Sequence, residues 1–359
     1  MRLPVSIITG FLGSGKTTLL NRLLQDPAMA GAAVIINEFG EIGLDHLLIA
    51  TPNENTVLLS SGCICCTVRG DLVNTLRDLD KQRREGNLPP FDRVLIETTG
   101  LADPVPIVQT VVVDEKLAPH YQLDSVITLV DAVNGSAQLD DQPESRKQAA
   151  VADRLLISKA DLADAAAVSR LKDRLSVLNP GAEILESAHG QIAPEVLFGA
   201  AIAPESHAAE VARWLREDDY VRVETRQGMI QSAHDDGIRA YSLVLDQPIT
   251  RAGLTAWLTA LASLRGAELL RVKGLLNVEG EPVAVHAVQT LIHEPVNLQQ
   301  WPDEERRSRL VFITRNMTRD AVAGTLDVLG WQSQLAAGGV PKPDPQVYAR
   351  FLAAMTKMH

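Results

Sequence analysis

The sequence has few aromatic residues, no concentrated stretch of positive charge and no long hydrophobic run. Aromatic residues make up only 4% of the 359 residues, so Leu, Val, Ile and Ala must fill the core of a globular protein that is 46% apolar. The net charge is −11 without a Lys/Arg stripe, which argues against a nucleic-acid partner and against binding to an anionic membrane. No apolar run could span a bilayer, and the N-terminus lacks the features of a signal peptide. We therefore expect a cytoplasmic protein.

Cysteine is also scarce, and all three cysteines lie within four positions, at Cys63, Cys65 and Cys66. In a reducing cytoplasm, such a cluster indicates metal binding or redox chemistry rather than a structural disulfide. Three small buried hydrophobic side chains are the remaining alternative. In an extended segment Cys63 and Cys65 face one way and Cys66 the other, so one ion could bind all three thiolates only after a turn. We expect Cys66 to stand just ahead of a helix that begins at Val68, where the helix N-terminus would lower the thiol pKa.

The pattern of apolar segments changes along the chain. In the first half, near-continuous apolar strands alternate with helical segments, which predicts an α/β domain with a mostly parallel sheet covered on both faces. The later strands and helices predict a smaller α+β domain. We divide the chain into residues 1–200, a linker at 201–238 and a C-terminal domain at 239–359. In the C-terminal domain, three basic residues could form a patch that faces a partner protein, or they could simply be solvated. These residues are Arg271, Lys273 and Arg315.

Residues 10–17 read GFLGSGKT and match the P-loop pattern G-x-x-x-x-G-K-[ST] between a predicted strand and a predicted helix. The glycines allow a tight turn whose N–H groups point at phosphate oxygens, and the helix adds its positive N-terminal end. We expect Lys16 to reach the β- and γ-phosphates and Thr17 to bind Mg²⁺. A glycine-rich turn without a ligand is the alternative. The predicted nucleotide contacts in this segment are Gly10, Gly13, Ser14, Gly15, Lys16, Thr17 and Thr18.

The segment ETTG, at residues 97–100, follows another apolar strand and predicts a P-loop NTPase together with the previous motif. We expect Glu97 to hold Mg²⁺ or to place the attacking water, and the N–H of Gly100 to sense the γ-phosphate. A solvated glutamate at the end of a buried strand is the plain alternative.

The segment SKAD, at residues 158–161, is similar to the Asn-Lys-x-Asp motif with which GTP-binding proteins recognise guanine. Asp161 would accept hydrogen bonds from the guanine edge, and the stem of Lys159 would lie along the base. Ser158 replaces the Asn of that motif and reaches less far, so the guanine prediction depends mainly on Asp161. The alternative is that Asp161 caps a helix.

Five segments occur in the order typical of one GTPase family: GFLGSGKTT, INEFGEIGLD, GCICC, ETTGLADP and SKADL. In these segments the chain resembles the CobW-like GTPases, which are similar to the nickel-chaperone GTPases of urease and hydrogenase maturation. The resemblance covers the first half specifically and extends through RVKGLLN and VHAVQ to the family's C-terminal domain. It implies a metallochaperone or metal-insertion factor, mostly for zinc and in some branches for cobalt or iron.

The resemblance also implies which residues hold the transferred metal. The family's Cys-x-Cys-Cys motif corresponds to Cys63, Cys65 and Cys66, with Zn²⁺ as the expected ion and Co²⁺ or Fe²⁺ as alternatives. Three thiolates leave a fourth position for a carboxylate, a water or a recipient protein. Glu38 and Glu41, in the acidic segment after the second predicted strand, are implied as metal ligands, with a solvated acidic loop as the alternative.

These observations predict a GTPase that uses Mg²⁺ to hydrolyse GTP to GDP and phosphate and so drives delivery of a transition metal to an apo-metalloprotein. The expected catalytic residues are Lys16, Glu38 and Glu97. Because the cysteine segment lies between the acidic loop and the ETTG loop, we expect metal affinity and nucleotide affinity to be linked. Two alternatives are a nucleotide-gated regulator whose thiols sense redox state and an ATP-dependent small-molecule kinase.

Overall fold

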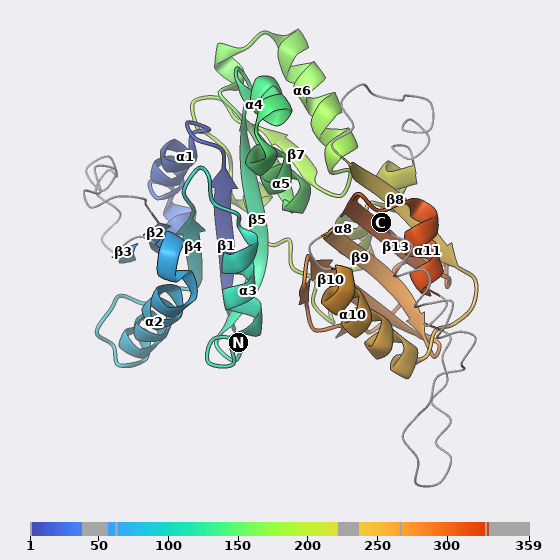
Figure 1. Cartoon of the computed structure of the whole chain (residues 1–359). Coiled ribbons are helices and arrows are strands. Elements are labelled where there is room, and N and C mark those ends of the chain that lie inside the picture. Colours follow the sequence, from blue (N-terminus) through green and yellow to red (C-terminus); the bar gives the residue numbers. More distant parts are fainter. Residues whose placement is uncertain are drawn as a thin grey trace. The chain divides into compact units, whose positions relative to one another are not determined.

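The computed structural model describes residues 2–37, 57–61, 64–221, 237–265, 268–326 and 329. The chain divides into two compact units, Met1–Ala201 and Ile202–His359, which are described separately (Figure 1). Within the predicted linker, residues 208–215 form a helix, and residues 222–236 lie outside the described residues.

The first unit is built on a parallel sheet, as predicted. In the described residues this sheet has seven strands in the order β3-β2-β4-β1-β5-β6-β7, and each neighbouring pair is parallel. The strands are β1 (Leu3–Gly10), β2 (Ala32–Asn37), β3 (Val57–Ser61), β4 (Arg93–Glu97), β5 (Tyr121–Asp131), β6 (Arg154–Ser158) and β7 (Glu183–Glu186). Their carboxyl ends therefore meet at one edge of the sheet. The short segment EILE that forms β7 was not anticipated from the sequence.

Helices cover both faces of this sheet (Figure 1). They are α1 (Lys16–Leu23), α2 (Ile64–Arg84), α3 (Val105–Val113), α4 (Gly135–Asp141), α5 (Pro143–Val151), α6 (Ala165–Leu178) and α7 (Pro194–Leu197), with 3-10 turns η1 (Pro27–Met29) and η3 (Ala160–Leu162). Leu129 of β5 packs in a cluster with α1, whereas its neighbour Val130 packs in a cluster with α4, α5 and α6. Since consecutive strand residues point to opposite faces, these two helix groups lie on opposite sides of the sheet.

Helix α2 begins earlier than the sequence predicted. The expected start was Val68, but the helix runs from Ile64, so Cys65 and Cys66 lie within its first turn. The segment ICCT contains no Pro or Gly that would delay the helix, and the helix extends through it. Because consecutive helical residues are rotated by about 100°, the alternation expected for an extended segment does not apply to this pair. Cys63 lies outside the described residues.

The second unit is an antiparallel sheet with helices, in agreement with the predicted α+β class. Its strand order is β11-β10-β9-β13-β8, and β12 pairs with β10. The strands are β8 (Ile238–Leu245), β9 (Leu269–Val278), β10 (Glu281–Val288), β11 (Leu291–Ile292), β12 (Val296–Asn297) and β13 (Ser308–Arg315); the helices are α8 (Ala208–Leu215), α10 (Arg251–Arg265) and α11 (Arg319–Thr325).

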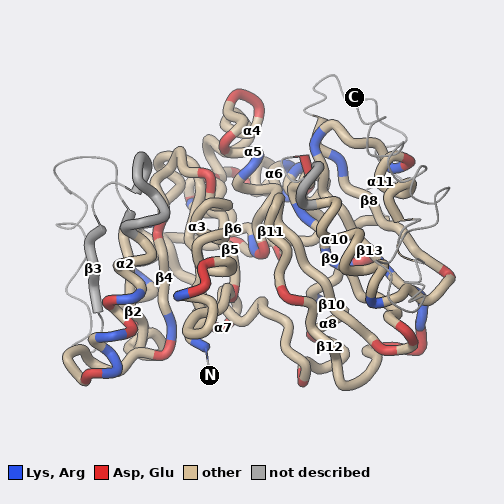
Figure 2. The backbone as a smooth tube through the Cα atoms, turned by 60° about the horizontal axis from the view of Figure 1, so that its bottom comes forward, with Lys and Arg blue, Asp and Glu red and all other residues tan. Residues whose placement is uncertain are grey.

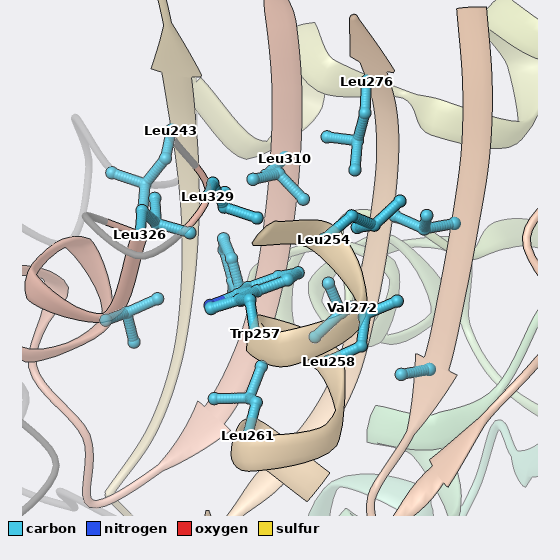
Figure 3. Packing of buried hydrophobic residues seen from close by; sticks show 14 of the residues in the cluster. Leu243, Leu254, Trp257, Leu258, Leu261, Val272, Leu276, Leu310, Leu326 and Leu329 are labelled. Atoms are coloured by element: carbon cyan, nitrogen blue, oxygen red, sulfur yellow. The ribbon is translucent and has the colours of Figure 1, made fainter. Parts of the chain in front are cut away.

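The core of the second unit centres on Trp257 of α10 (Figure 3). Leu254, Trp257, Leu258 and Leu261 follow the spacing of one helix face, and all four are buried against the sheet. The indole Nε1 of Trp257 donates a 3.0 Å hydrogen bond to Oγ1 of Thr325, which satisfies its buried donor and joins α10 to α11.

The predicted basic patch on this unit is wrong for two of its three residues. Arg271 and Lys273, on β9, are buried rather than exposed to a partner or to solvent. The Nζ of Lys273 donates a 2.9 Å hydrogen bond to the carbonyl oxygen of Trp214 in α8. Elsewhere, positive and negative residues are interspersed along the backbone of both units (Figure 2). None of the helices among the described residues combines the length and apolar character needed to cross a membrane.

Candidate nucleotide site

The polar residues predicted from three separate motifs meet at one edge of the parallel sheet. The carboxyl ends of β4, β1, β5, β6 and β7 lie side by side, and these strands end at Glu97, Gly10, Asp131, Ser158 and Glu186. Ligands bind α/β sheets at this edge, where the strand order changes direction around the first strand. The arrangement brings the P-loop, the ETTG loop and the SKAD segment together.

The backbone of the P-loop requires its glycines. Gly10, Gly13 and Gly15 all have positive φ, at 143°, 72° and 92°. A Cβ on Gly10 would lie 2.5 Å from the carbonyl oxygen of Leu129, so no larger residue fits there. Gly15 is the N-cap of α1 and offers no side chain to that helix, which leaves the N–H groups of the first turn to an anion. This loop fits a phosphate group.

Lys16 is held over the loop by carbonyl oxygens. Its Nζ lies 2.8 Å from the oxygen of Gly10 and 3.2 Å from that of Phe11, and the residue is 8% exposed. Carbonyl dipoles hold a buried ammonium group less strongly than an anion does. A phosphate bound in the loop would therefore be a better partner for this charge than the oxygens that now hold it.

Thr17 and Glu97 come together although 80 residues separate them. The hydroxyl of Thr17 donates a 2.8 Å hydrogen bond to Oε1 of Glu97, and Glu97 is 5% exposed. A hydroxyl and a carboxylate beside a phosphate loop are the oxygen ligands that Mg²⁺ prefers. The donor set of this pair therefore fits Mg²⁺.

The ETTG loop packs directly on the P-loop. Thr98 Oγ1 donates a 2.8 Å hydrogen bond to Oγ1 of Thr9, and the Thr98 N–H donates to the oxygen of Ile8. A Cβ on Gly100 would lie 2.6 Å from the backbone nitrogen of Leu12, so only glycine allows this approach. The Gly100 backbone is thus next to the loop in which a phosphate fits.

At the other end of the site, Ser158 contacts the P-loop. Its hydroxyl donates a 2.6 Å hydrogen bond to the carbonyl oxygen of Ser14. The serine, which is shorter than the Asn of the guanine motif, thus binds the backbone of the P-loop. Lys159 Nζ lies 2.6 Å from Oδ2 of Asp131. Burial raises the pKa of Asp131, but hydrogen bonds from Lys159, Val133 and Asn134 more than offset this and hold its pKa below its usual value.

Asp161 has a partner that the sequence interpretation missed. Its Oδ1 accepts a 3.0 Å hydrogen bond from the N–H of His189, and its Oδ2 lies 3.1 Å from His189 Nδ1. The hydrogen bond from that N–H is the main cause of a lowered pKa at Asp161. His189 belongs to the turn after β7, and Asp131, the partner of Lys159, is the last residue of β5. The sequence feature that could have indicated the His189 contact is the polar turn SAHG, because it follows the short segment EILE, which ends at the same edge of the sheet.

Comparison with known protein families identifies the family of proteins in which this kind of site occurs. Residues 4–186 match the CobW/HypB/UreG nucleotide-binding domain, and residues 238–329 match the cobalamin synthesis protein CobW C-terminal domain. The chain belongs to the CobW/HypB/UreG family. The first unit is therefore a nucleotide-binding domain, and the predicted resemblance is confirmed.

Relatives of this CobW-family chain are similar over nearly their whole length. The zinc chaperone YjiA of Escherichia coli is 36% identical over 313 residues, which cover 87% of this chain and 93% of YjiA. The zinc chaperone CobW of Pseudomonas aeruginosa is 31% identical and covers 90% of this chain and 91% of its own length. The crystal structure of Zn(II)-bound YjiA GTPase from E. coli superposes with a TM-score of 0.66 at 29% identity, over 90% of this chain and 97% of that structure.

The structure describes only part of the segments that are predicted to bind the transferred metal in this CobW-family chain. Glu38, Glu41 and Cys63 lie outside the described residues; for Cys65 and Cys66, the structure describes the backbone of α2. Among the side chains that are described, no group of three His, Cys, Asp or Glu could hold a metal ion. The backbone nevertheless fixes where the two segments begin. Asn37 pairs with Ser61 across β2 and β3, and Ile36 pairs with Glu97 across β2 and β4.

Proposed function

We propose that this protein is a GTP-hydrolysing metallochaperone that binds Zn²⁺ at Cys63, Cys65 and Cys66 and delivers it to a recipient apoprotein. The observation that carries this proposal is the register of three parallel strands at the nucleotide edge. The acidic segment begins after Asn37 of β2 and the cysteine segment after Ser61 of β3, one residue beyond the row in which Ile36 pairs with Glu97 of β4. Strands of a sheet lie about 4.8 Å apart, so both segments start within about 10 Å of Glu97.

The residues of the phosphate end have distinct roles in this proposal. The backbone of Gly13 to Thr18 and the ammonium of Lys16 bind the phosphates and stabilise the charge that develops during transfer. Thr17 and Glu97 would hold Mg²⁺, which supplies electrostatic stabilisation of the phosphate oxygens. The Gly100 N–H meets the γ-phosphate, because its backbone already packs against the P-loop at Leu12.

The base end supports guanine as the nucleotide's base. Asp161 is a carboxylate in η3, just after β6, with a lowered pKa, so it accepts hydrogen bonds at neutral pH. Guanine offers two N–H donors on one edge, whereas adenine does not offer that pair. Both oxygens of Asp161 now contact His189, and a guanine base would take over those contacts.

Nucleotide and metal would be coupled through the strand ends. GTP in the P-loop would order the acidic segment after β2 and the ETTG loop after β4, and β2 lies between β3 and β4 in the sheet. A change in the acidic segment therefore reaches the residues that precede Cys63. By linkage, GTP must change zinc affinity by the same factor by which zinc changes GTP affinity. The names of the relatives, zinc chaperones in two bacteria, support zinc as the cargo.

The test is a zinc titration of the reduced, metal-free protein with a non-hydrolysable GTP analogue, with GDP and without nucleotide. We expect about one tightly bound Zn²⁺, an affinity that differs between the analogue and GDP, and loss of that site in Cys65→Ser. Asp161→Ala is the matched control, since without nucleotide it should bind zinc like the wild type.

Each competing function gives a different result in these experiments. Equal zinc affinity in all three nucleotide states would contradict the coupling. A redox regulator would show a thiol-dependent phenotype in Cys65→Ser without any change in zinc binding. A small-molecule kinase would transfer phosphate to an acceptor, and Asp161→Ala would leave its base preference unchanged.

A further inference from the structure

Gln148 is a buried amide that contacts the ETTG loop from a distant part of the sequence. It lies on α5 and is 1% exposed. Its Nε2 lies 3.2 Å from the carbonyl oxygen of Gly100 and 2.9 Å from that of Ala102. Two carbonyl oxygens can only accept hydrogen bonds, so the NH₂ end of the amide must face them. One side chain thus binds two backbone groups of the loop that packs on the P-loop.

The helix that carries Gln148 is held by β5 at this residue and by the end of α6 just after it. Thr128 Oγ1 on β5 donates a 2.8 Å hydrogen bond to the carbonyl oxygen of Gln148 itself. Nδ2 of Asn179, which is fully buried, lies 2.8 to 3.1 Å from the carbonyl oxygens of Ala149, Ala150 and Ala152 at the end of α5. Gln148 is therefore a fixed point against which a loop can be positioned.

The neighbouring residue on α5 anchors the far end of the same loop. Lys147 Nζ lies 2.6 Å from Oδ2 of Asp103. The other carboxylate oxygen of Asp103 accepts a hydrogen bond from the N–H of Val105, where α3 begins. Between Gly100 and Asp103 the loop thus contacts α5 on one side, while Gly100 contacts Leu12 of the P-loop on the other.

We propose that Gln148 is a positioning residue for GTP hydrolysis, which holds the Gly100 backbone where its N–H can meet the γ-phosphate. This inference rests on the proposed GTPase function. The loop is enclosed between Leu12 and Gln148, so the amide determines how far the Gly100 backbone lies from the phosphate loop. Gln148 acts only through Gly100 and Ala102 and touches no nucleotide itself. It should therefore affect the triphosphate state and hydrolysis but not the binding of GDP.

The two ends of the Gln148 amide affect stability in opposite directions, because Nε2 bonds two loop carbonyl oxygens whereas Oε1 does not find a partner in the described part of the chain. Oε1 of Gln148 is buried and has no hydrogen-bond partner among the described residues. A buried acceptor without a partner destabilises the folded state. Replacing Gln148 by Met keeps the length of the side chain and removes this acceptor together with the donor. The two loop carbonyl oxygens also lose their hydrogen bonds from Nε2, so the melting temperature should fall moderately while positioning is lost.

The experiment compares Gln148→Met and Gln148→Glu with the wild type in three measurements: GTP hydrolysis, affinity for a non-hydrolysable GTP analogue against GDP, and thermal unfolding. Because a small misplacement of a positioned group costs up to about 100-fold in rate, we expect kcat to fall about 10- to 100-fold in Gln148→Met. The preference for the analogue over GDP should fall, and GDP affinity should stay at the wild-type value. In Gln148→Glu both loop carbonyls would face a carboxylate, so its loss should be at least as large. Gln138→Met on α4 is the matched control and should behave like the wild type.

Two outcomes would overturn the inference alone. One is a Gln148→Met protein with the wild-type kcat and the wild-type preference for the analogue. The other is an equal loss of affinity for both nucleotides together with a lower melting temperature, which is the signature of a purely structural residue. A wild-type protein that hydrolyses no GTP would instead overturn the proposed function, and with it this inference.

Discussion

Lys16 in the first unit and Lys273 in the second are both buried lysines whose ammonium groups contact backbone carbonyl oxygens. Lys16 contacts two carbonyls of the glycine loop that it follows. Lys273 contacts the carbonyl of Trp214 in the last turn of α8, and its Nζ lies 5.3 Å from the centroid of the Trp214 ring. The same chemical group thus lies in a loop that fits an anion in one unit and at a helix C-terminus in the other, where a cation is stabilising in its own right.

The two sheets explain this difference. In the parallel sheet every strand ends at the same edge, so the polar residues that follow the strands converge there. In the antiparallel sheet the ends of neighbouring strands point in opposite directions. Buried polar groups of the second unit pair with one another instead, as Trp257 of α10 does with Thr325 of α11. The comparison predicts that polar substitutions in the first unit change ligand binding and catalysis, whereas those in the second change stability.

The largest expected effect is that of Lys16→Met. Removing one preorganised charge from a phosphoryl-transfer site costs about 10²–10³-fold in rate, so GTP hydrolysis should fall by at least that factor. The melting temperature should not fall, because the substitution also removes a buried charge from the nucleotide-free protein. Steady-state phosphate release and thermal unfolding would measure both. Wild-type turnover in this variant would show that the glycine loop is not the catalytic phosphate site.

Asp161→Ala should change base preference. The loss of two hydrogen bonds to a nucleobase edge is worth about 1–3 kcal/mol, so the preference for GTP over ATP should fall by roughly tenfold to 100-fold. Competition between the two nucleotides for a fluorescent analogue would measure it. His189→Ala serves as the control, since it removes the imidazole that contacts Oδ2 of Asp161 and leaves the carboxylate with its backbone hydrogen bond. If Asp161→Ala keeps the wild-type preference, Asp161 only fixes the turn after β7.

Lys273→Met tests the second unit. The substitution removes a charged hydrogen bond to the end of α8, so the free energy of unfolding should fall by about 1–2 kcal/mol. GTP hydrolysis per folded molecule should stay at the wild-type rate. Chemical denaturation and phosphate release measure these quantities on the same preparation. A loss of hydrolysis without a loss of stability would mean that the two units do not divide ligand binding and stability as the comparison suggests.

The same difference decides what could be predicted from the sequence. The glycine spacing of the P-loop predicted the phosphate site, because the motif itself fixes the backbone. Strand alternation likewise predicted the parallel sheet. The contact between Ser158 and Ser14 could not be predicted, since it depends on how far apart β6 and the P-loop lie. The burial of Arg271 and Lys273 could not be predicted either, because a β-strand residue is exposed or buried according to what covers its face.

Two carboxylates, one in each unit, extend the comparison to the pH dependence of stability. We expect this to be the smallest of the predicted effects. The pKa of Asp131 is lowered, so it stabilises the fold above its usual value of 3.8 and that contribution is lost as the pH falls below it. In the second unit, burial raises the pKa of Glu217 above its usual 4.5, although nearby Arg309 acts to lower it. The folded state then binds more protons than the unfolded state just above pH 4.5, so this contribution to stability falls as the pH rises through that window.

Glu217→Gln keeps the uncharged form at every pH and should remove this loss. Its free energy of unfolding relative to the wild type should therefore increase as the pH is raised from 4 to neutral, as measured by denaturant unfolding at each pH. Glu195→Gln, which changes an exposed glutamate of the first unit, is the matched control and should show no such trend. If instead Glu217→Gln loses stability with rising pH, the pair of Glu217 with Arg309, at 3.7 Å, outweighs the burial of the carboxylate. The second unit would then contain a stabilising ion pair rather than a buried carboxylate that destabilises the fold.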